Sequence, residues 1–312
     1  MINVKENEPL KNHSTFHIGG PAKYFSLVKD SAELMEAIEW AEEKSLPYQI
    51  IGGGSNILAG DKGYNGLIIK TLGVEAIFSG NLMECFAGLP LAKAMNDSLA
   101  KGYVGLEWAI GIPGTIGGAT HNNAGAYGGE IADNVKSVKV LRQGKIIDIL
   151  GVDCGFGYRA SRFKTEGDGD VILSATLRLE KADTAKVALA RKKMSRIIRE
   201  RINKFVGFSA GSAFKNIILS KEEIRSFKNK YPEFPEQFVE FNKLPAAWLI
   251  DRCELKGFEL GGAKVSDKHA GIIINTGKAT AKDVIMLISI IKQKVRSKYG
   301  QQLMEEIEYI GF

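Results

Sequence analysis

Hydrophobic and polar residues alternate with helical and strand spacing through the first hundred residues. In segment 30–44, apolar side chains recur on one face and Asp30 can cap the start, so this segment is predicted to be a helix. The apolar runs 48–51 and 67–70, each next to turn residues, are typical of short strands. A further helix is expected from about 91 to 101. This alternation predicts an α/β organisation for the N-terminal part.

Strands and helices of a second set follow in the remainder of the chain. Segments 135–141 and 171–179 alternate apolar and polar residues, as antiparallel strands do. A charged amphipathic helix is predicted over 184–205 and can link two domains. A short strand at 272–275 and a helix at 280–299, whose first residue is a capping threonine, indicate a second α/β unit. We therefore expect a domain boundary near residue 200.

Composition and charge narrow the class of protein. The chain has 312 residues, 45% hydrophobic and 25% charged, as expected for a globular protein of two or three domains. The net charge of +6 favours anionic partners, but no basic block is long enough to indicate nucleic acid. Three cysteines without a CxxC pair, and no HExxH, argue against a metal. With a polar N-terminus and no apolar run of membrane length, a cytoplasmic protein without membrane contact is expected. A monomer is also expected, although no sequence feature indicates the oligomeric state.

Two glycine-rich segments interrupt the periodic pattern. The first, IGGGSN at 51–56, follows a predicted strand, and the second, GIPGTIGGA at 111–119, lies in a stretch, 105–135, predicted to be an ordered loop. Backbone N–H groups unobstructed by side chains can surround a phosphate. Neither segment matches the usual dinucleotide or P-loop fingerprint. Either the two segments bind one large nucleotide together, or they are a tight turn and a buried crossover.

Two other segments contain side chains suited to chemistry. Tyr158 and Arg159 follow a Gly-Phe-Gly turn, and a guanidinium fork matches a carboxylate or phosphate in two bonds. The alternative is a surface hairpin with solvated charges. Ser212 lies in SAGSAFKN without a GxSxG context or an evident histidine base, which favours a proton donor over a nucleophile. The simpler alternative is a turn or cap residue.

The C-terminal part adds basic and acidic candidates. Lys264 and His269 either contact a ligand or support their loop. In the terminal EEIEYIG segment, strand alternation puts Glu306 and Glu308 on one face and Ile307 with Tyr309 on the other. A terminal strand can thus present a carboxylate to a site, and the alternative is a solvated acidic edge.

Seven segments, taken in order, resemble the UDP-N-acetylenolpyruvoylglucosamine reductase family, and the resemblance covers nearly the whole chain. Each segment alone is a weak match to the family, but seven matches in the family's order are highly specific. They are NHSTFHIGGPA at 12–22, IGGGSN at 51–56, GLEWAIGIPGTIGGATHNNAGAYGGEI at 105–131, YRASRFK at 158–164, SAGSAFKN at 209–216, AKVSDKHAGIIIN at 263–275 and EEIEYIG at 305–311.

The resemblance implies an α+β fold. Family members have an FAD-binding portion of the vanillyl-alcohol-oxidase (PCMH) type, made of two α/β subdomains, and a C-terminal α/β domain for the substrate. On this basis 1–200 is the FAD-binding region, with subdomains at about 1–72 and 73–200. Residues 201–303 are then the substrate domain, and 304–312 a strand that returns to the active site. The spacing between the motifs resembles the shorter of two family forms.

The resemblance also implies roles for single residues. Arg159 matches the arginine of the family's Tyr-Arg motif, Ser212 matches its proton-donating serine, and Glu306 matches its C-terminal glutamate. The expected substrate-binding residues are Tyr158, Lys215, Asn216, Lys264 and His269, and the expected FAD-binding residues are Gly52, Gly53, Gly54, Ser55, Asn56, Gly111, Pro113, Gly114, Gly117, Gly118 and Ala119.

The implied activity is NADPH-dependent reduction of UDP-N-acetylglucosamine enolpyruvate to UDP-N-acetylmuramate through bound FAD, in peptidoglycan precursor synthesis. Arg159 on the substrate carboxylate would make the alkene electron-poor, Ser212 would protonate the carbon next to it, and Glu306 would help to hold the developing charge. Two positions depart from the family. Ile217 replaces the usual proline, and Glu308 stands where a basic residue is common.

Two other functions stay open from the residues alone. The first is another flavin oxidase of the same fold that oxidises an alcohol or sugar. Such enzymes often attach FAD covalently through a histidine or cysteine, and His121 is the candidate for that bond. A nucleotide-sugar binding protein without catalysis is the other possibility, although the complete set of Arg159, Ser212 and Glu306 argues against it.

Overall fold

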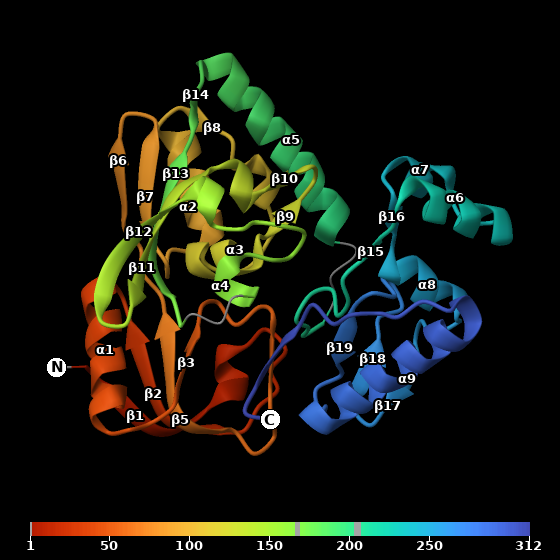
Figure 1. Ribbon diagram of the computed structural model, residues 1–312, viewed down its shortest axis with the longest axis horizontal. Helices are drawn as coiled ribbons and strands as arrows, with labels where there is room; N and C mark the ends of the chain where they lie inside the picture. The colour runs from red at the N-terminus through yellow and green to blue at the C-terminus, as the bar shows by residue number, and fades with distance from the viewer. Residues whose placement is uncertain (1, 166–168, 203–206) are drawn as a thin grey trace. The chain divides into compact units, whose positions relative to one another are not determined.

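The computed structural model describes residues 2–165, 169–202 and 207–312, and Figure 1 labels its elements. The chain divides into two compact units. The first comprises Met1–Pro9, Pro21–Ser55 and Tyr64–Asn203, and the second comprises Leu10–Gly20, Asn56–Gly63 and Lys204–Phe312. Two short segments from the N-terminal part of the chain therefore fold with the C-terminal part.

The first unit begins with a four-stranded sheet in the order β1-β2-β5-β3. Its strands are β1 (Val4–Pro9), β2 (Pro21–Val28), β5 (Tyr64–Thr71) and β3 (Tyr48–Ile51). Strand β5 is parallel to both β2 and β3, and β1 is antiparallel to β2. Helix α1 (Ser31–Glu43) packs on one face, and Asp30 accepts the N–H of Glu33 as its cap. The helix, the cap and both strands predicted here are confirmed.

A five-stranded antiparallel sheet, in the order β12-β11-β13-β7-β6, completes the first unit. The two antiparallel strands predicted at 135–141 and 171–179 are confirmed by β11 and β13, which the structure shows to pair with each other. The core of this unit joins both sheets, because Leu173 of β13 and Leu34 of α1 lie in one buried cluster. The strands are β6 (Ala76–Ser79), β7 (Leu82–Phe86), β11 (Val135–Arg142), β12 (Lys145–Leu150) and β13 (Val171–Arg178), with two-stranded pairs of β8 (Tyr103–Val104) with β14 (Glu180–Lys181) and of β9 (Gly125–Ala126) with β10 (Gly129–Glu130).

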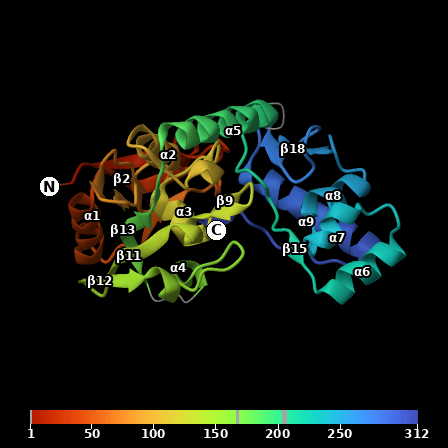
Figure 2. The ribbon, with the colours of Figure 1, turned by 90° about the horizontal axis from the view of Figure 1, so that it is seen from above.

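Helices cover the five-stranded sheet and close the unit. Helix α3 packs on β13 and β7, and α5 buries Met194 and Ile197 against the same core (Figures 1 and 2). The helical segments are α2 (Leu91–Ala100), α3 (Ile116–Asn122), α4 (Arg162–Thr165), α5 (Thr184–Ile202) and the short 3-10 turns η2 (Glu107–Ala109), η3 (Ile131–Asp133) and η4 (Gly151–Asp153). The helix predicted over 184–205 is confirmed to Ile202; 203–206 lie outside the described residues.

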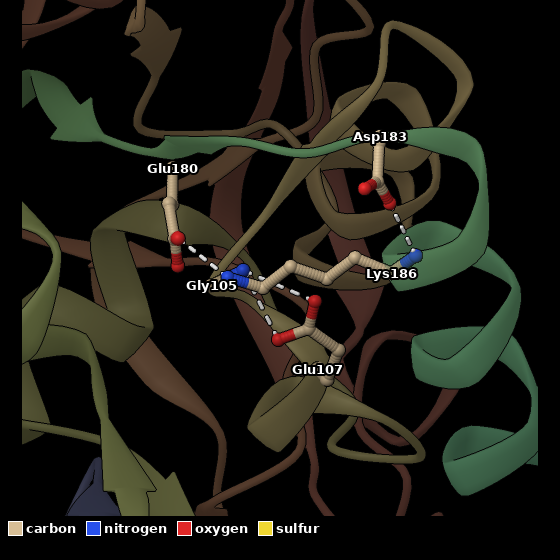
Figure 3. A network of polar contacts seen from close by, with 5 residues as sticks. All are labelled: Gly105, Glu107, Glu180, Asp183 and Lys186. Carbon is tan, nitrogen blue, oxygen red and sulfur yellow. Dashed lines mark hydrogen bonds and ion pairs between the residues drawn. The ribbon is translucent and has the colours of Figure 1, made fainter.

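A polar network fixes the start of α5 (Figure 3). The N–H of Lys186 donates to Asp183 Oδ1 over 2.7 Å, and the Lys186 ammonium pairs with Glu180 on β14. Both carboxylate oxygens of Glu107 accept the N–H of Gly105, at 3.1 and 3.0 Å. The bonds to Asp183 and Glu107 satisfy the backbone N–H groups of Lys186 and Gly105, which follow the paired strands β14 and β8.

The glycine-rich stretch 105–135 differs from its prediction as a loop. It contains α3, the turns η2 and η3, and the hairpin of β9 with β10. Two consecutive glycines, Gly117 and Gly118, lie in α3, and glycine disfavours a helix interior. Thr115 caps this helix through the N–H of Gly118, and packing of Ile116 and Ala119 against the core outweighs the weak propensity.

The second unit is built around one long helix. Helix α9 (Ala281–Tyr299) packs on the sheet of β17, β18 and β19 and buries the side of Val284, Leu287 and Ile291. The predicted strand 272–275 and helix 280–299 are confirmed by β19 and α9. The remaining elements are η1 (Leu10–His13), β4 (Ile57–Ala59), β15 (Ile217–Ile218), α6 (Lys221–Lys230), α7 (Glu236–Glu240), β16 (Lys243–Leu244), α8 (Ala246–Arg252), β17 (Glu259–Leu260), β18 (Ala263–Val265), β19 (Ile273–Asn275) and β20 (Glu308–Ile310).

Distant segments of the chain complete this unit. The carboxylate of Asp61 accepts the N–H groups of Ala281 and Lys282 at 2.8 and 3.1 Å, so the 56–63 segment caps α9. Strand β20 runs parallel to β4. Within the described residues, no helix is long and apolar enough to cross a bilayer.

Acid should weaken the start of α9 through Asp283. Its carboxylate accepts the N–H groups of Thr280 and Gly262, at 3.0 and 3.2 Å, and these bonds lower its pKa below 3.8. A lowered folded-state pKa stabilises the fold above pH 3.8, and that stabilisation is lost as the pH falls through the folded value. Asp283→Asn should cost about 1 kcal/mol at pH 7. It should also show a weaker loss of stability below pH 4 than the wild type, measured by urea unfolding.

The exposed Asp148, on β12, provides the control. Asp148→Asn should keep the wild-type pH dependence. An Asp283→Asn protein whose acid dependence equals that of the wild type would contradict the assignment.

Candidate active site

The two glycine-rich segments meet in the first unit. A β-carbon at Gly53 would lie 3.0 Å from the Cα of Gly114, and one at Gly52 would lie 2.4 Å from Thr115 Oγ1. The hydroxyl of Ser55 donates to the carbonyl of Pro113 over 3.1 Å. The structure therefore brings together the two segments that the family resemblance assigned to FAD.

The second glycine segment is held rigidly from behind. Gly117 donates its N–H to the carbonyl of Ala87 over 2.7 Å, and a β-carbon at Gly117 would lie 2.8 Å from the Ala87 side chain. The N–H of Ile116 donates to Leu89, and that of Leu91 donates to Gly114. A backbone fixed in this way presents its surface without rearrangement when a ligand binds.

The residues present fit a flat, phosphate-bearing cofactor such as FAD. The two loops adjoin with no side chain between Gly53 and Gly114, so their backbones form one continuous surface. Gly111 and Gly118 are exposed, and Gly54 adopts a left-handed φ of 68°. Backbone amides in such loops are suited to anionic oxygens.

Arg159 is placed by a strained turn. The N–H of Gly157 donates to the Ala160 carbonyl at 3.0 Å and the reverse bond is 3.1 Å, so Tyr158 and Arg159 form the tip. Arg159 has a φ of 53°, a left-handed conformation that is costly for a residue with a long side chain. Its guanidinium lies 5.5 Å from the Tyr158 ring centroid. Backbone strain of this kind is common at functional sites.

The segment after α3 orients the arginine. Nη2 of Arg159 donates to the carbonyl of Gly125 over 2.9 Å, and Nη1 lies 3.4 Å from that of Asn123. Asn123, fully buried with a φ of 44°, donates from Nδ2 to Gly157 and accepts the N–H of Ala132. Asn123 is a positioning residue that the sequence analysis missed. Its signal was an asparagine before a small residue at a helix end, where a left-handed cap is common.

The same helix end carries His121, the residue considered for a covalent flavin bond. Its carbonyl accepts the hydroxyl of the buried Ser161 over 2.6 Å, and the ammonium of Lys164 donates to Asn122 over 2.6 Å. These bonds tie the Tyr-Arg motif to α3. Ser161 and Lys164 therefore support the turn that carries Arg159.

In the second unit, Ser212 lies on a short extended segment with neighbours on both sides. It forms a bridge with Ile272, and the N–H of Ala213 donates to Gly271 over 2.8 Å. On the other side, the N–H of Glu306 donates to Ala213 over 2.9 Å. Ser212 is exposed, while Ala213 beside it is buried. Two residues predicted to be catalytic, Ser212 and Glu306, thus lie on neighbouring segments.

The hydroxyl of Ser212 does not bond to the backbone near it in the described part of the chain. It takes part in no hydrogen bond across residues 2–165, 169–202 and 207–312. The turn before it is provided by Gly211, whose φ is 74°. A serine acting as a helix cap or turn former would bond nearby backbone. These observations argue against the simpler interpretation of Ser212.

The C-terminal segment is irregular where Glu306 lies. Strand β20 begins only at Glu308, and Ile307 is buried while Tyr309 is 39% exposed, so the predicted strict alternation over 306–309 is wrong. Asn56 explains part of the irregularity: its Nδ2 donates to the Glu306 carbonyl over 3.0 Å, and its carbonyl accepts the N–H of Glu308. In this unit Asn56 holds the glutamate in place.

The other predicted substrate residues have visible local contacts. Asn216 Oδ1 accepts the N–H of Ala246 at 3.1 Å, and the N–H of Lys215 donates to Met304. The Lys264 ammonium pairs with Asp267 at 2.7 Å, which raises the pKa of Lys264 through that hydrogen bond. His269 Nδ1 accepts the N–H of Gly271, the residue bonded to Ala213. His269 thus lies next to the Ser212 segment, whereas Lys264 is engaged with its own loop.

Comparisons with known proteins agree over the full chain. Residues 22–149 match a sequence model for an FAD binding domain, and residues 201–310 match one for the C-terminal domain of UDP-N-acetylenolpyruvoylglucosamine reductase. Proteins of that name from Caldicellulosiruptor bescii and Carboxydothermus hydrogenoformans are each 37% identical over 99% of this chain, covering 91% and 94% of their own lengths. The crystal structure of the reductase from Thermus caldophilus superposes with a TM-score of 0.76 at 29% identity, covering 100% of this chain and 99% of its own. The α+β fold expected from the sequence is thereby confirmed.

Two glycine variants separate packing from cofactor contact. Gly52→Ala should destabilise the protein by about 1–3 kcal/mol, because its β-carbon would clash with the buried Thr115. Gly118→Ala should leave stability unchanged or slightly higher, since its β-carbon meets only Thr115 Oγ1 at an ordinary 3.7 Å. It should nevertheless weaken FAD binding about tenfold, because the exposed β-carbon enters the expected cofactor surface.

Thermal unfolding of apoprotein and FAD titration by flavin fluorescence measure the two effects. Full FAD affinity in Gly118→Ala would remove that residue from the cofactor site.

Proposed function

The chain belongs to the UDP-N-acetylenolpyruvoylglucosamine reductase family, and we propose that its reaction is carried by Arg159, Ser212 and Glu306. The reaction is the NADPH-dependent reduction of the enolpyruvyl ether of UDP-N-acetylglucosamine to UDP-N-acetylmuramate. When bound, FAD would supply the two-electron chemistry that links NADPH to the terminal vinyl carbon of the substrate. The observation that best supports the assignment is the exposed Ser212 hydroxyl, which bonds to nothing in the described chain.

Arg159 is assigned to the substrate carboxylate. An enolpyruvyl ether is electron-rich and accepts hydride poorly until its carboxylate is paired with a cation. The guanidinium, oriented through its bond to Gly125, would bind that carboxylate and stabilise the negative charge that builds on it as the vinyl carbon gains hydride. Because the turn holds it in advance, little reorganisation is needed during the reaction.

Ser212 is assigned to the proton. After hydride addition, the neighbouring carbon carries enolate character and is a strong base, so even a weakly acidic hydroxyl can protonate it. The O–H bond of Ser212 breaks as the C–H bond forms, and solvent returns a proton to the oxygen. A donor fixed on one side also sets the configuration of the new stereocentre.

Glu306 and the nucleotide contacts complete the proposal. Glu306, held by its backbone bond to Ala213, would hydrogen-bond near the substrate carboxylate and help to hold the developing charge. Lys215, Asn216 and Tyr158 would bind the nucleotide sugar, with His269 and Lys264 supporting that loop. Asn216 can do so while its Oδ1 caps α8 through Ala246.

The domain roles follow the same assignment. We propose that residues 1–200 bind FAD through two subdomains, that 201–303 bind the nucleotide sugar, and that 304–312 bring Glu306 to the site. We also propose that the enzyme works in the cytoplasm as a monomer, where its nucleotide substrate and NADPH are available.

Ser212→Ala should separate the two half-reactions. Reduction of the flavin by NADPH should keep its wild-type rate, because no proton from Ser212 is needed. Reoxidation by UDP-N-acetylglucosamine enolpyruvate should slow by about 10²-fold or more. Anaerobic stopped-flow absorbance at the flavin band measures both steps.

Ser289→Ala is the matched control, since within the described residues that serine bonds only to the carbonyl of Ile285 in its own helix. Equal reoxidation in Ser212→Ala and the wild type would assign the proton to another group. If the wild-type protein is not reoxidised, the substrate is wrong.

Arg159→Lys should retain the charge but lose the fork. Reoxidation should slow by about tenfold to a hundredfold, because a planar two-bond contact with a carboxylate cannot be reproduced by an ammonium. The backbone strain at φ 53° should be the same in both proteins, since arginine and lysine each carry a β-carbon. Arg162→Lys, whose guanidinium donates to the Asp153 carbonyl, is the control. An Arg159→Lys enzyme with unchanged reoxidation would contradict carboxylate binding at this position.

A further inference from the structure

Lys70 is a half-buried lysine at the end of a parallel sheet. It is the penultimate residue of β5, and its register partner on β3 is Ile51, the last residue before the glycine loop 52–56. Adjacent strands lie about 4.8 Å apart. In sheets of parallel strands, ligands bind beyond the carboxyl ends, where the loops leave the strands. Lys70 therefore stands at the ligand edge, one strand away from the glycine loop.

The face on which Lys70 lies is set by the register. Leu67 and Ile69 belong to the core under α1, and alternation puts Lys70 on the opposite face. Its partners there are Leu27 of β2, which is 42% exposed, and Ile51. The lysine is thus not enclosed by α1, and its long stem can follow apolar neighbours toward the loop.

No group of the protein neutralises this cation in the described parts of the chain. Over residues 2–165, 169–202 and 207–312, Lys70 makes no ion pair and no side-chain hydrogen bond. Burial lowers its pKa below 10.5, with no compensating partner. Compare Lys139, which pairs with Glu84 at 3.0 Å in the neighbouring sheet of the same unit. A partly desolvated cation without a partner costs stability, and binding an anion can offset that cost.

We infer that Lys70 is a cofactor-binding residue whose ammonium contacts the diphosphate of FAD at the glycine loop 52–56. The glycine loops provide neutral N–H donors, and in the described first unit Lys70 provides a positive charge at the same sheet edge. The inference rests on the proposed role of these loops in binding FAD. A diphosphate is also present in NADPH and in the UDP-sugar, so the experiment must distinguish these sources.

The test compares FAD binding by the apoprotein of wild type, Lys70→Met, Lys70→Arg and Lys145→Met. Lys145 is exposed on β12 and controls for the loss of one charge. FAD titration should show an affinity at least about tenfold weaker than that of the wild type in Lys70→Met. Affinity should be close to that of the wild type in Lys70→Arg and unchanged in Lys145→Met. ADP, which retains the diphosphate, should lose affinity in parallel, whereas riboflavin, which lacks it, should not.

A stability measurement distinguishes a cofactor-binding role of Lys70 from a structural one. Apo Lys70→Met should unfold at the same temperature as the wild type or higher, because the desolvated charge is gone. A lower unfolding temperature together with equal losses for FAD and riboflavin would overturn the inference in favour of a structural role. Unchanged FAD affinity would also overturn it, and a raised KM for NADPH or the UDP-sugar in that case would reassign the lysine to that ligand. Wild-type apoprotein that binds no FAD would instead refute the proposed function itself.

Discussion

The backbone contact between Gly53 and Gly114 is the constraint on which the first unit depends. At 3.0 Å from a β-carbon position to the opposing Cα, no side chain can be tolerated at Gly53 without movement of the backbone. The contact places Gly52 against Thr115, which caps α3. Helix α3 in turn ends at Asn123, which orients the turn that carries Arg159. A single close approach thus relates the two glycine segments to Arg159 through a series of hydrogen-bonded steps.

In the second unit, an extended segment rather than a helix positions the candidate side chain, Ser212. Residues 212–215 are bonded to Gly271 on one side and to Met304 and Glu306 on the other. The flanking Ala213 and Phe214 are buried and anchor the segment, which leaves Ser212 at the surface. Because the segment is bonded on both sides, Ser212 is held in place before any ligand binds, which lowers the entropic cost of ordering it.

Local periodicity was enough to predict α1, α9 and the strands β11 and β13, because each has an amphipathic pattern of its own. Helix α3 was missed, since Gly117 and Gly118 lower helix propensity and only tertiary packing restores it. Contacts such as Asp61 with Ala281, or Asn56 with Glu306, join residues more than two hundred positions apart and leave no spacing signal. The site residues came from motif order, whereas the positioning role of Asn123 needed coordinates.

Some polar residues of the first unit have a hydrogen-bond or ion-pair partner within the protein and others do not. The same distinction applies to Ser212 in the second unit. Ser161 is fully buried and donates to His121, and the carboxylate of Asp170 binds Arg142 through two bonds. Such groups lose nothing when the protein folds, so they stabilise architecture. In the described chain, Ser212 and Lys70 have no such partner. Because Ser212 is exposed and Lys70 is only half-buried, their polar groups remain available to a ligand, which agrees with the roles proposed for both residues.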